Sequence, residues 1–165
     1  MELYLVRHGI AEDTDPMGVR SDAERALTPE GVKKADEAAR GLRALNVRPD
    51  RIGSSPMVRA KETADVLARV LCPKVTIEEC AFLAEGAETE KAVDWLRESP
   101  VDSAMLVGHM PQIAELASEL LGKGAQVRMV FKRSTVCCIS FEGSPGPGKG
   151  RLEWLLQPRH LRRLA

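Results

Sequence analysis

Residues 2–9 read ELYLVRHG, a short apolar run that ends in Arg7, His8 and Gly9. A run of this length and composition is typical of a buried β-strand. Gly9 has no Cβ, so the backbone can turn away from the strand end without crowding a ligand. The next residues, 11–26, are polar and charged, and we expect them to form a long surface loop.

Strands and helices alternate through the rest of the chain. Thr28 followed by Pro29, and Ser55 followed by Pro56, have the cap-then-proline pattern of helix starts. Two further helices are expected over 89–98 and from Pro111 to about 121. The remaining apolar runs predict strands over 50–54, 75–80, 103–108, 135–141 and 151–156. This alternation predicts an α/β sandwich with a mostly parallel sheet, with the last pair antiparallel at one edge.

Composition limits the classes of function. The 165 residues are near the size of one compact domain, and 24 basic residues balance 24 acidic ones. A net charge of zero argues against nucleic acid and acidic membranes as partners. We expect neither a leader segment nor a membrane-spanning run, and therefore a cytoplasmic protein, by default a monomer.

Four cysteines occur without metal-type spacing, so we expect reduced, mostly buried thiols. Cys137 and Cys138 are neighbours in a strand-like run and should point to opposite faces of the sheet.

Three of the predicted strands end in residues suited to chemistry. The first ends in Arg7-His8-Gly9, and the second in Ser54-Ser55-Pro56 with Arg59 close behind. The strand over 103–108 is followed by His109. Ligands of open parallel sheets bind beyond the carboxyl ends of the strands, so we expect these side chains to meet at one edge.

Two histidines and two arginines at such an edge suit a phosphoryl group. Each guanidinium can bind phosphate oxygens through two hydrogen bonds. A neutral His8 can attack phosphorus through a ring nitrogen, and His109, if protonated, can donate to a phosphoryl oxygen. The expected helix start at Ser55-Pro56 adds a favourable dipole for an anion. The pattern therefore predicts phosphoryl transfer.

Other charged residues are weaker candidates. Glu85 follows the 75–80 strand and could act as the general acid, or it could be a solvated loop carboxylate. A metal could bind the acidic side chains of the first loop, although their spacing matches no known metal loop: Glu12, Asp13 and Asp15. Four residues make a basic tail, which we expect to be solvated or docked on the sheet edge: Arg159, His160, Arg162 and Arg163.

Together these motifs resemble the histidine phosphatase superfamily, and within it the SixA-like phosphohistidine phosphatases. The similarity includes LYLVRHGIA at 3–11, LTPEG at 27–31, SSP with Arg59 and ETA at 54–64, and LVGHMP at 106–111. It implies one histidine phosphatase domain over 1–165 with the phosphoglycerate mutase-like fold, a three-layer α/β/α sandwich. It also implies that His8 becomes phosphorylated, that Arg7, Arg59 and His109 complete the phosphate pocket, and that no metal or organic cofactor is needed.

Departures from the mutase pattern favour the SixA-like subgroup. Ile10-Ala11 follows the RHG motif, Glu85 is the one possible acid, and the long insertions of mutases are missing. Phosphohistidine leaves as imidazole, which needs a strong general acid less than an alkoxide does. The resemblance thus implies a phosphohistidine-bearing partner such as a histidine phosphotransfer domain. Two alternatives remain: a phosphatase of small phosphate esters, and a non-enzymatic phosphate-binding protein.

Overall fold

The computed structural model describes residues 1–14, 17, 21–84, 89–98 and 100–165. Its elements in chain order are β1 (Glu2–Arg7), η1 (Asp22–Glu24), α1 (Pro29–Ala44), β2 (Arg51–Ser54), α2 (Val58–Leu71), β3 (Ile77–Glu79), η2 (Ala81–Leu83), α3 (Thr89–Glu98), β4 (Ser103–Gly108), α4 (Gln112–Gly122), β5 (Val136–Ser140), β6 (Arg151–Leu156) and α5 (Pro158–Leu161).

The strands form one six-stranded sheet in the order β3-β2-β4-β1-β5-β6. The pairs β2–β3, β2–β4 and β1–β4 are parallel, whereas β5 runs antiparallel to both β1 and β6. The predicted mostly parallel sheet with an antiparallel last pair is therefore confirmed. Strand β1 lies inside the sheet, so the residues that follow it emerge between the ends of two neighbouring strands.

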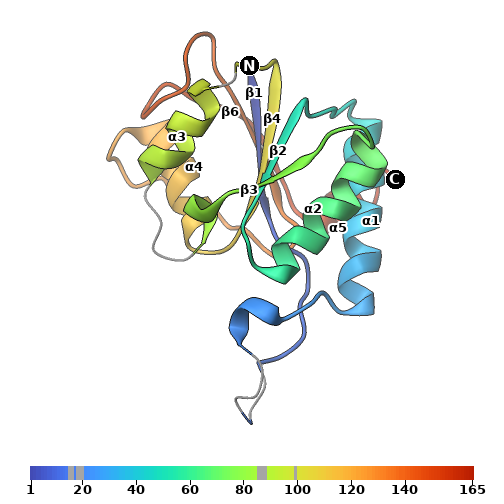
Figure 1. Ribbon diagram of the computed structural model, residues 1–165. Helices are drawn as coiled ribbons and strands as arrows, with labels where there is room; N and C mark the ends of the chain where they lie inside the picture. The colour runs from blue at the N-terminus through green and yellow to red at the C-terminus, as the bar shows by residue number, and fades with distance from the viewer. Residues whose placement is uncertain (15–16, 18–20, 85–88, 99) are drawn as a thin grey trace.

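Helices cover both faces of the sheet, which confirms the three-layer sandwich. Helices α1, α2 and α5 lie on one face, and α3 and α4 on the other (Figure 1). Alternation along β1 sends Leu3 and Leu5 into the core under α3 and α4, and Tyr4 and Val6 into the core under α1 and α2.

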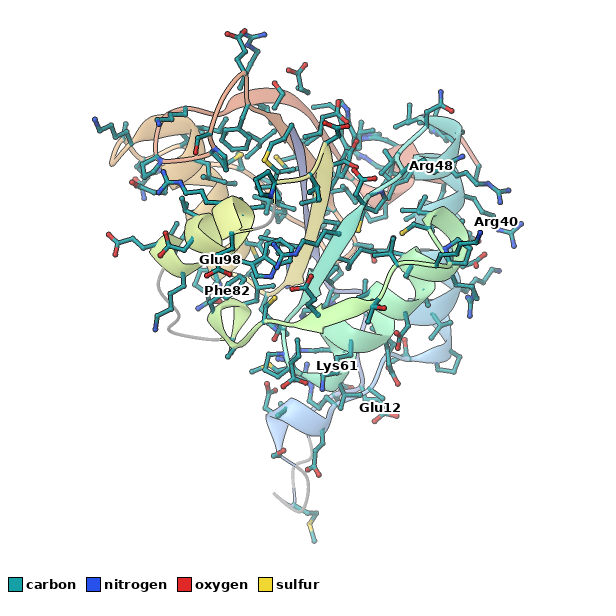
Figure 2. All side chains as sticks on the ribbon, turned by 45° about the horizontal axis from the view of Figure 1, so that its top comes forward. Glu12, Arg40, Arg48, Lys61, Phe82 and Glu98 are labelled. Carbon is teal, nitrogen blue, oxygen red and sulfur yellow. The ribbon has the colours of Figure 1, made fainter. Side chains whose placement is uncertain are left out.

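The cysteines of β5 follow the same alternation. Cys137 packs into the core under α3 and α4, and Cys138 into the core under α1 and α2, as predicted. Both thiols are buried and free. Charged side chains such as Arg40, Arg48 and Glu98 are exposed on the outside of the molecule (Figure 2).

Several boundaries differ from the predictions. Helix α1 begins as expected, because the Thr28 hydroxyl accepts a hydrogen bond of 2.9 Å from the Gly31 N–H. Helix α2 instead begins at Val58, with Met57 at the N-cap, so the predicted start at Ser55-Pro56 is wrong. Strand β3 is shorter than predicted, since the parallel pairing with β2 covers only Ile77–Glu79.

The basic tail, expected to be solvated or docked on the sheet edge, begins as a helix, and its residues Arg159 and Arg163 are exposed. Its short helix α5 packs on α1, and Leu161 is fully buried in the core beneath them. No helix in the described part of the chain has the length and apolar character needed to span a bilayer.

Candidate functional site

The strand register brings the predicted site residues to one edge of the sheet. Arg7 pairs with Gly108 across β1 and β4, and Ser54 pairs with Val107 across β2 and β4. The residues that continue these strands, His8, Ser55 and His109, therefore leave the sheet side by side. The rings of His8 and His109 lie 5.0 Å apart between centroids.

His8 is held as a neutral imidazole. Its side chain is buried, and Nδ1 lies 2.7 Å from the carbonyl oxygen of Gly9. A carbonyl oxygen can only accept, so Nδ1 carries the hydrogen and Nε2 carries the lone pair. Burial, together with the nearby charges of His109, Arg59 and Arg7, lowers the pKa of His8 to about 3, although the hydrogen bond to Gly9 acts in the opposite direction. A lone pair at Nε2 is what a nucleophile at phosphorus requires.

Gly9 is fixed by a side chain from α2. Its N–H donates to the Thr63 hydroxyl at 3.0 Å, and the same hydroxyl donates to the Arg59 carbonyl at 2.7 Å. Thr63 is almost fully buried. It therefore couples the backbone that holds His8 to the first turn of the helix that carries Arg59.

His109 is oriented by Ser55. Its Nε2 lies 2.7 Å from the Ser55 hydroxyl, while Nδ1 is buried and has no partner among the residues described. Burial, and then the charge of Arg59, lower the pKa of His109 to about 4. The protonated form, on which the donor role considered from the sequence depends, is thus disfavoured in the free protein, and an anion next to the ring would favour it.

The guanidinium of Arg59 is 4% exposed and is held by the first loop. Its Nη1 donates to the Asp22 carbonyl at 2.6 Å, and its Nη2 donates to the Asp22 carboxylate at 2.8 Å. Arg7 donates from Nη1 to the Phe131 carbonyl at 2.7 Å. The Nε atoms of Arg7 and Arg59 are both buried without a partner in the described structure.

Two residues of the first loop were not predicted to belong to the site. Asp22 pairs with both Arg59 and Arg25, and these hydrogen bonds and charges lower the pKa of its carboxyl. The Arg25 Nε is likewise buried and unpartnered within the described structure. Ser21 and Glu24 form a capping box that starts η1, and this S-x-x-E spacing is the one sequence signal that could have placed the segment.

Two of the weaker candidates fall on residues outside the described structure. Glu85 lies there, so its prediction as a general acid stays a prediction. The same holds for Asp15 of the acidic loop. Within the described ranges, no group of three His, Cys, Asp or Glu side chains is arranged to hold a metal ion.

The chain is similar to one protein-family model and to several curated proteins. The model of the histidine phosphatase superfamily (branch 1) matches residues 3–87. The mitochondrial serine/threonine-protein phosphatase Pgam5 of Drosophila yakuba is 34% identical over 133 residues, which are 79% of this chain and 39% of that protein. An uncharacterized protein of Picosynechococcus is 33% identical over 73% of each chain. This chain thus spans well under half the length of the Pgam5 relative.

The chain is also similar in fold to solved structures of phosphatases. The protein histidine phosphatase SixA complexed with tungstate superposes with a TM-score of 0.85 at 25% identity, covering 98% of this chain and 99% of that one. A SixA structure from Agrobacterium tumefaciens gives 0.77 at 26% identity, over 95% and 97%. A phosphoserine phosphatase from Entamoeba histolytica gives 0.70 at 17% identity over 97% and 98%, which is a likeness of fold.

Proposed function

We propose that this chain, which belongs to the histidine phosphatase superfamily (branch 1), removes the phosphoryl group from a phosphohistidine carried on a signalling protein. One observation supports a phosphoryl-binding site beside His8. Three buried nitrogen atoms of groups whose charges act on His8 lack partners among the described residues: Nε of Arg7, Nε of Arg59 and Nδ1 of His109. Buried donors without acceptors are costly, and the oxygens of a phosphoryl group would satisfy them.

In the first step, Nε2 of His8 attacks phosphorus in line with the substrate nitrogen. The new N–P bond forms as the old one breaks, and the electron pair stays on the substrate imidazole. If the other nitrogen of that ring carries a proton, the leaving group departs as neutral imidazole, without a general acid. Arg7, Arg59 and His109 stabilise the charge on the phosphoryl oxygens.

In the second step, water attacks the phosphorus of the enzyme intermediate. The bond between phosphorus and Nε2 breaks, its electron pair returns to His8, and a water proton passes to solvent as orthophosphate leaves. The Asp22 carboxylate accepts a hydrogen bond from Arg59, and its charge also acts on His109. No step of this scheme uses a metal, and we expect turnover to persist in a chelator.

Likeness to the two SixA structures supports phosphohistidine as the substrate class. A phosphatase of small phosphate esters, such as sugar or metabolite phosphates, is the second candidate, because the phosphoserine phosphatase of Entamoeba histolytica shares the fold. Both candidates use the same phosphoryl site. They differ in the part of the substrate that must fit beside the phosphoryl site, which is a protein segment for the first candidate and a small molecule for the second.

The test compares a phosphorylated histidine phosphotransfer domain with sugar phosphates as substrates for the wild-type chain, His8→Ala and His160→Ala. His160 is the third histidine and lies on α5, so it is the matched control. We expect the wild type and His160→Ala to prefer the phosphohistidine protein and to trap acid-labile phosphate. His8→Ala should lose turnover by at least about 10³-fold. Near-normal activity of His8→Ala would refute the nucleophile, and a preference for sugar phosphates would refute the substrate.

A further inference from the structure

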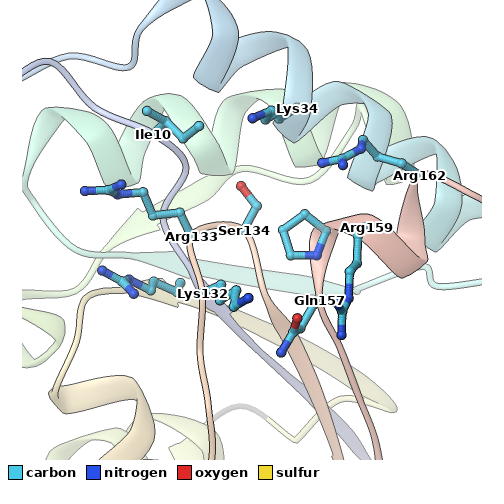
Figure 3. Close-up of a pocket in the computed structure, with 10 residues that line it drawn as sticks. Ile10, Lys34, Lys132, Arg133, Ser134, Gln157, Arg159 and Arg162 are labelled. Carbon is cyan, nitrogen blue, oxygen red and sulfur yellow. The ribbon is translucent and has the colours of Figure 1, made fainter.

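A strongly basic pocket lies next to the candidate phosphoryl site. Its volume is about 530 Å³, and its wall includes six cationic side chains and no carboxylate (Figure 3). The cations come from the strand end of β1, from α1, from the loop before β5, and from α5 and the residue that follows it: Arg7, Lys34, Lys132, Arg133, Arg159 and Arg162. We call this group the basic pocket.

The charge of the basic pocket is only partly balanced by the protein. Lys34 pairs with Glu30, and Arg162 lies 3.5 Å from Glu37. Among the described residues, no carboxylate forms an ion pair with Lys132, Arg133 or Arg159, and all three residues are exposed. Since the whole chain has no net charge, this accumulation is local. Like charges held together repel one another, and an anionic ligand relieves that repulsion.

The loop before β5 holds the basic pocket against the site. Ser134 adopts the left-handed conformation with φ of 59°. Its N–H lies 3.0 Å from the Arg7 carbonyl and 3.2 Å from the His8 carbonyl. Arg7 in turn donates to the Phe131 carbonyl of the same loop. Arg133 therefore follows directly on the segment that holds Arg7, and burial, followed by the charge of Arg133, lowers the pKa of Arg7. Arg7 lines the basic pocket and is also proposed to bind the phosphoryl group.

We infer that the basic pocket binds acidic side chains of the phosphoprotein that flank its phosphohistidine, an inference that rests on the proposed function. Two features favour several carboxylates over a second phosphate group. The cations are distributed over separate elements, and the three without carboxylate partners are exposed to solvent, where the side chains of a protein segment can reach them. A segment of protein that places its phosphohistidine at His8 would pass directly over these side chains.

The test uses short synthetic peptides with one phosphohistidine, flanked either by four Asp and Glu residues or by the matching Asn and Gln residues. Lys132→Gln, Arg133→Gln and Arg159→Gln are combined in one variant. Its control carries Arg43→Gln, Lys74→Gln and Lys149→Gln, which remove the same charge from exposed positions elsewhere. A small ester, p-nitrophenyl phosphate, reports the phosphoryl site alone.

We expect the wild type and the control variant to prefer the acidic peptide by about tenfold in kcat/KM, the size expected from three exposed ion pairs. The pocket variant should lose this preference and keep its turnover of p-nitrophenyl phosphate. Raising the salt concentration should reduce the preference. Equal rates on both peptides in the wild type, or an equal loss in both triple variants, would overturn the inference.

A second measurement separates this inference from the proposed function. The unphosphorylated acidic peptide should inhibit p-nitrophenyl phosphate hydrolysis in the wild type and the control variant, and inhibit the pocket variant about tenfold less. This result would support the pocket even if no phosphohistidine peptide were hydrolysed. Conversely, pocket-dependent inhibition by glucose 1,6-bisphosphate but not by the acidic peptide would overturn the inference in favour of a small bisphosphate.

Discussion

Nη2 of Arg59 donates a hydrogen bond of 2.8 Å to the carboxylate of Asp22, and Nη1 of the same guanidinium donates to the Asp22 backbone carbonyl. The carboxylate of Asp22, in the loop after β1, thus forms an ion pair with an arginine that is proposed to bind phosphate. The Asp22 side chain is 46% exposed, so this ion pair contributes little to folding, about 1 kcal/mol or less. Its larger effect is on the charge that an incoming phosphoryl group meets.

Asp22→Asn should strengthen the binding of orthophosphate severalfold, because it removes a negative charge beside Arg59 and His109 and keeps the backbone acceptor. The inhibition constant of orthophosphate against p-nitrophenyl phosphate hydrolysis measures this. Asp65→Asn, on the exposed side of α2, is the matched control and should leave the constant unchanged. Weaker phosphate binding by Asp22→Asn would show instead that Asp22 is needed to orient Arg59.

Ser55→Ala should lower kcat about tenfold and the free energy of unfolding by about 1–3 kcal/mol, because Nε2 of His109 is then buried without a partner. Ser55→Thr keeps the hydroxyl and should recover most of the activity. The control is Ser54→Ala, at an equally buried neighbour whose hydroxyl bonds only to the Ser55 carbonyl in the described structure. Equal kcat values for Ser55→Ala and Ser54→Ala would contradict a positioning role for Ser55.

Gly41→Ala should destabilise the fold by about 1–3 kcal/mol, because a Cβ at this position of α1 would lie 2.1 Å from the carbonyl oxygen of Leu161 on α5. The midpoint of urea unfolding measures the loss. Gly143→Ala, with no neighbouring atom within 4 Å of the added carbon, serves as the control. Since Arg159 lies on α5, the Gly41 variant should also lose part of its preference for acidic peptides. An unchanged midpoint would show that α5 is not fixed to α1.

The two buried histidines should make the protein acid-sensitive. In the native state their pKa values are lowered from 6.5 to about 3 for His8 and about 4 for His109. Below pH 6.5 the unfolded chain therefore binds protons that the native state does not, and stability falls with pH until each native pKa is reached. Each histidine contributes about 1.4 kcal/mol per pH unit within that window.

Denaturant unfolding of the wild type and His109→Asn between pH 7 and pH 4 measures this effect. The variant should show the shallower decline, because it retains only the contribution of His8. His160→Asn, outside the site, is the control for the loss of a histidine side chain. A His109→Asn curve parallel to the wild type would mean that the imidazole of His109 is not held neutral by its burial.

Local patterns predicted most of the framework. Apolar runs and the Thr28 cap depend on neighbouring residues alone, so β1, α1 and the strand ends carrying His8 and His109 could be placed from the sequence. Ser55 could not be assigned correctly, because a serine before proline fits a helix cap as well as a distant hydrogen bond. Asp22 gave no signal as a site residue, since its part in the site depends on Arg59, 37 residues away.

Strand β5 is antiparallel to β1, so the start of β5 lies beside the end of β1 that carries His8. The segment beside His8 is therefore the one that leads into β5. Residues 123–133 precede β5, and they belong neither to the paired strands nor to the segments that carry Arg59 and His109. The Phe131 carbonyl in this segment holds Arg7, whereas the neighbouring Lys132 and Arg133 are exposed, so their charges can change without removing that contact. Under the proposed function, substitutions at these two exposed positions would change which phosphoprotein is recognised, while the reaction at His8 stays the same.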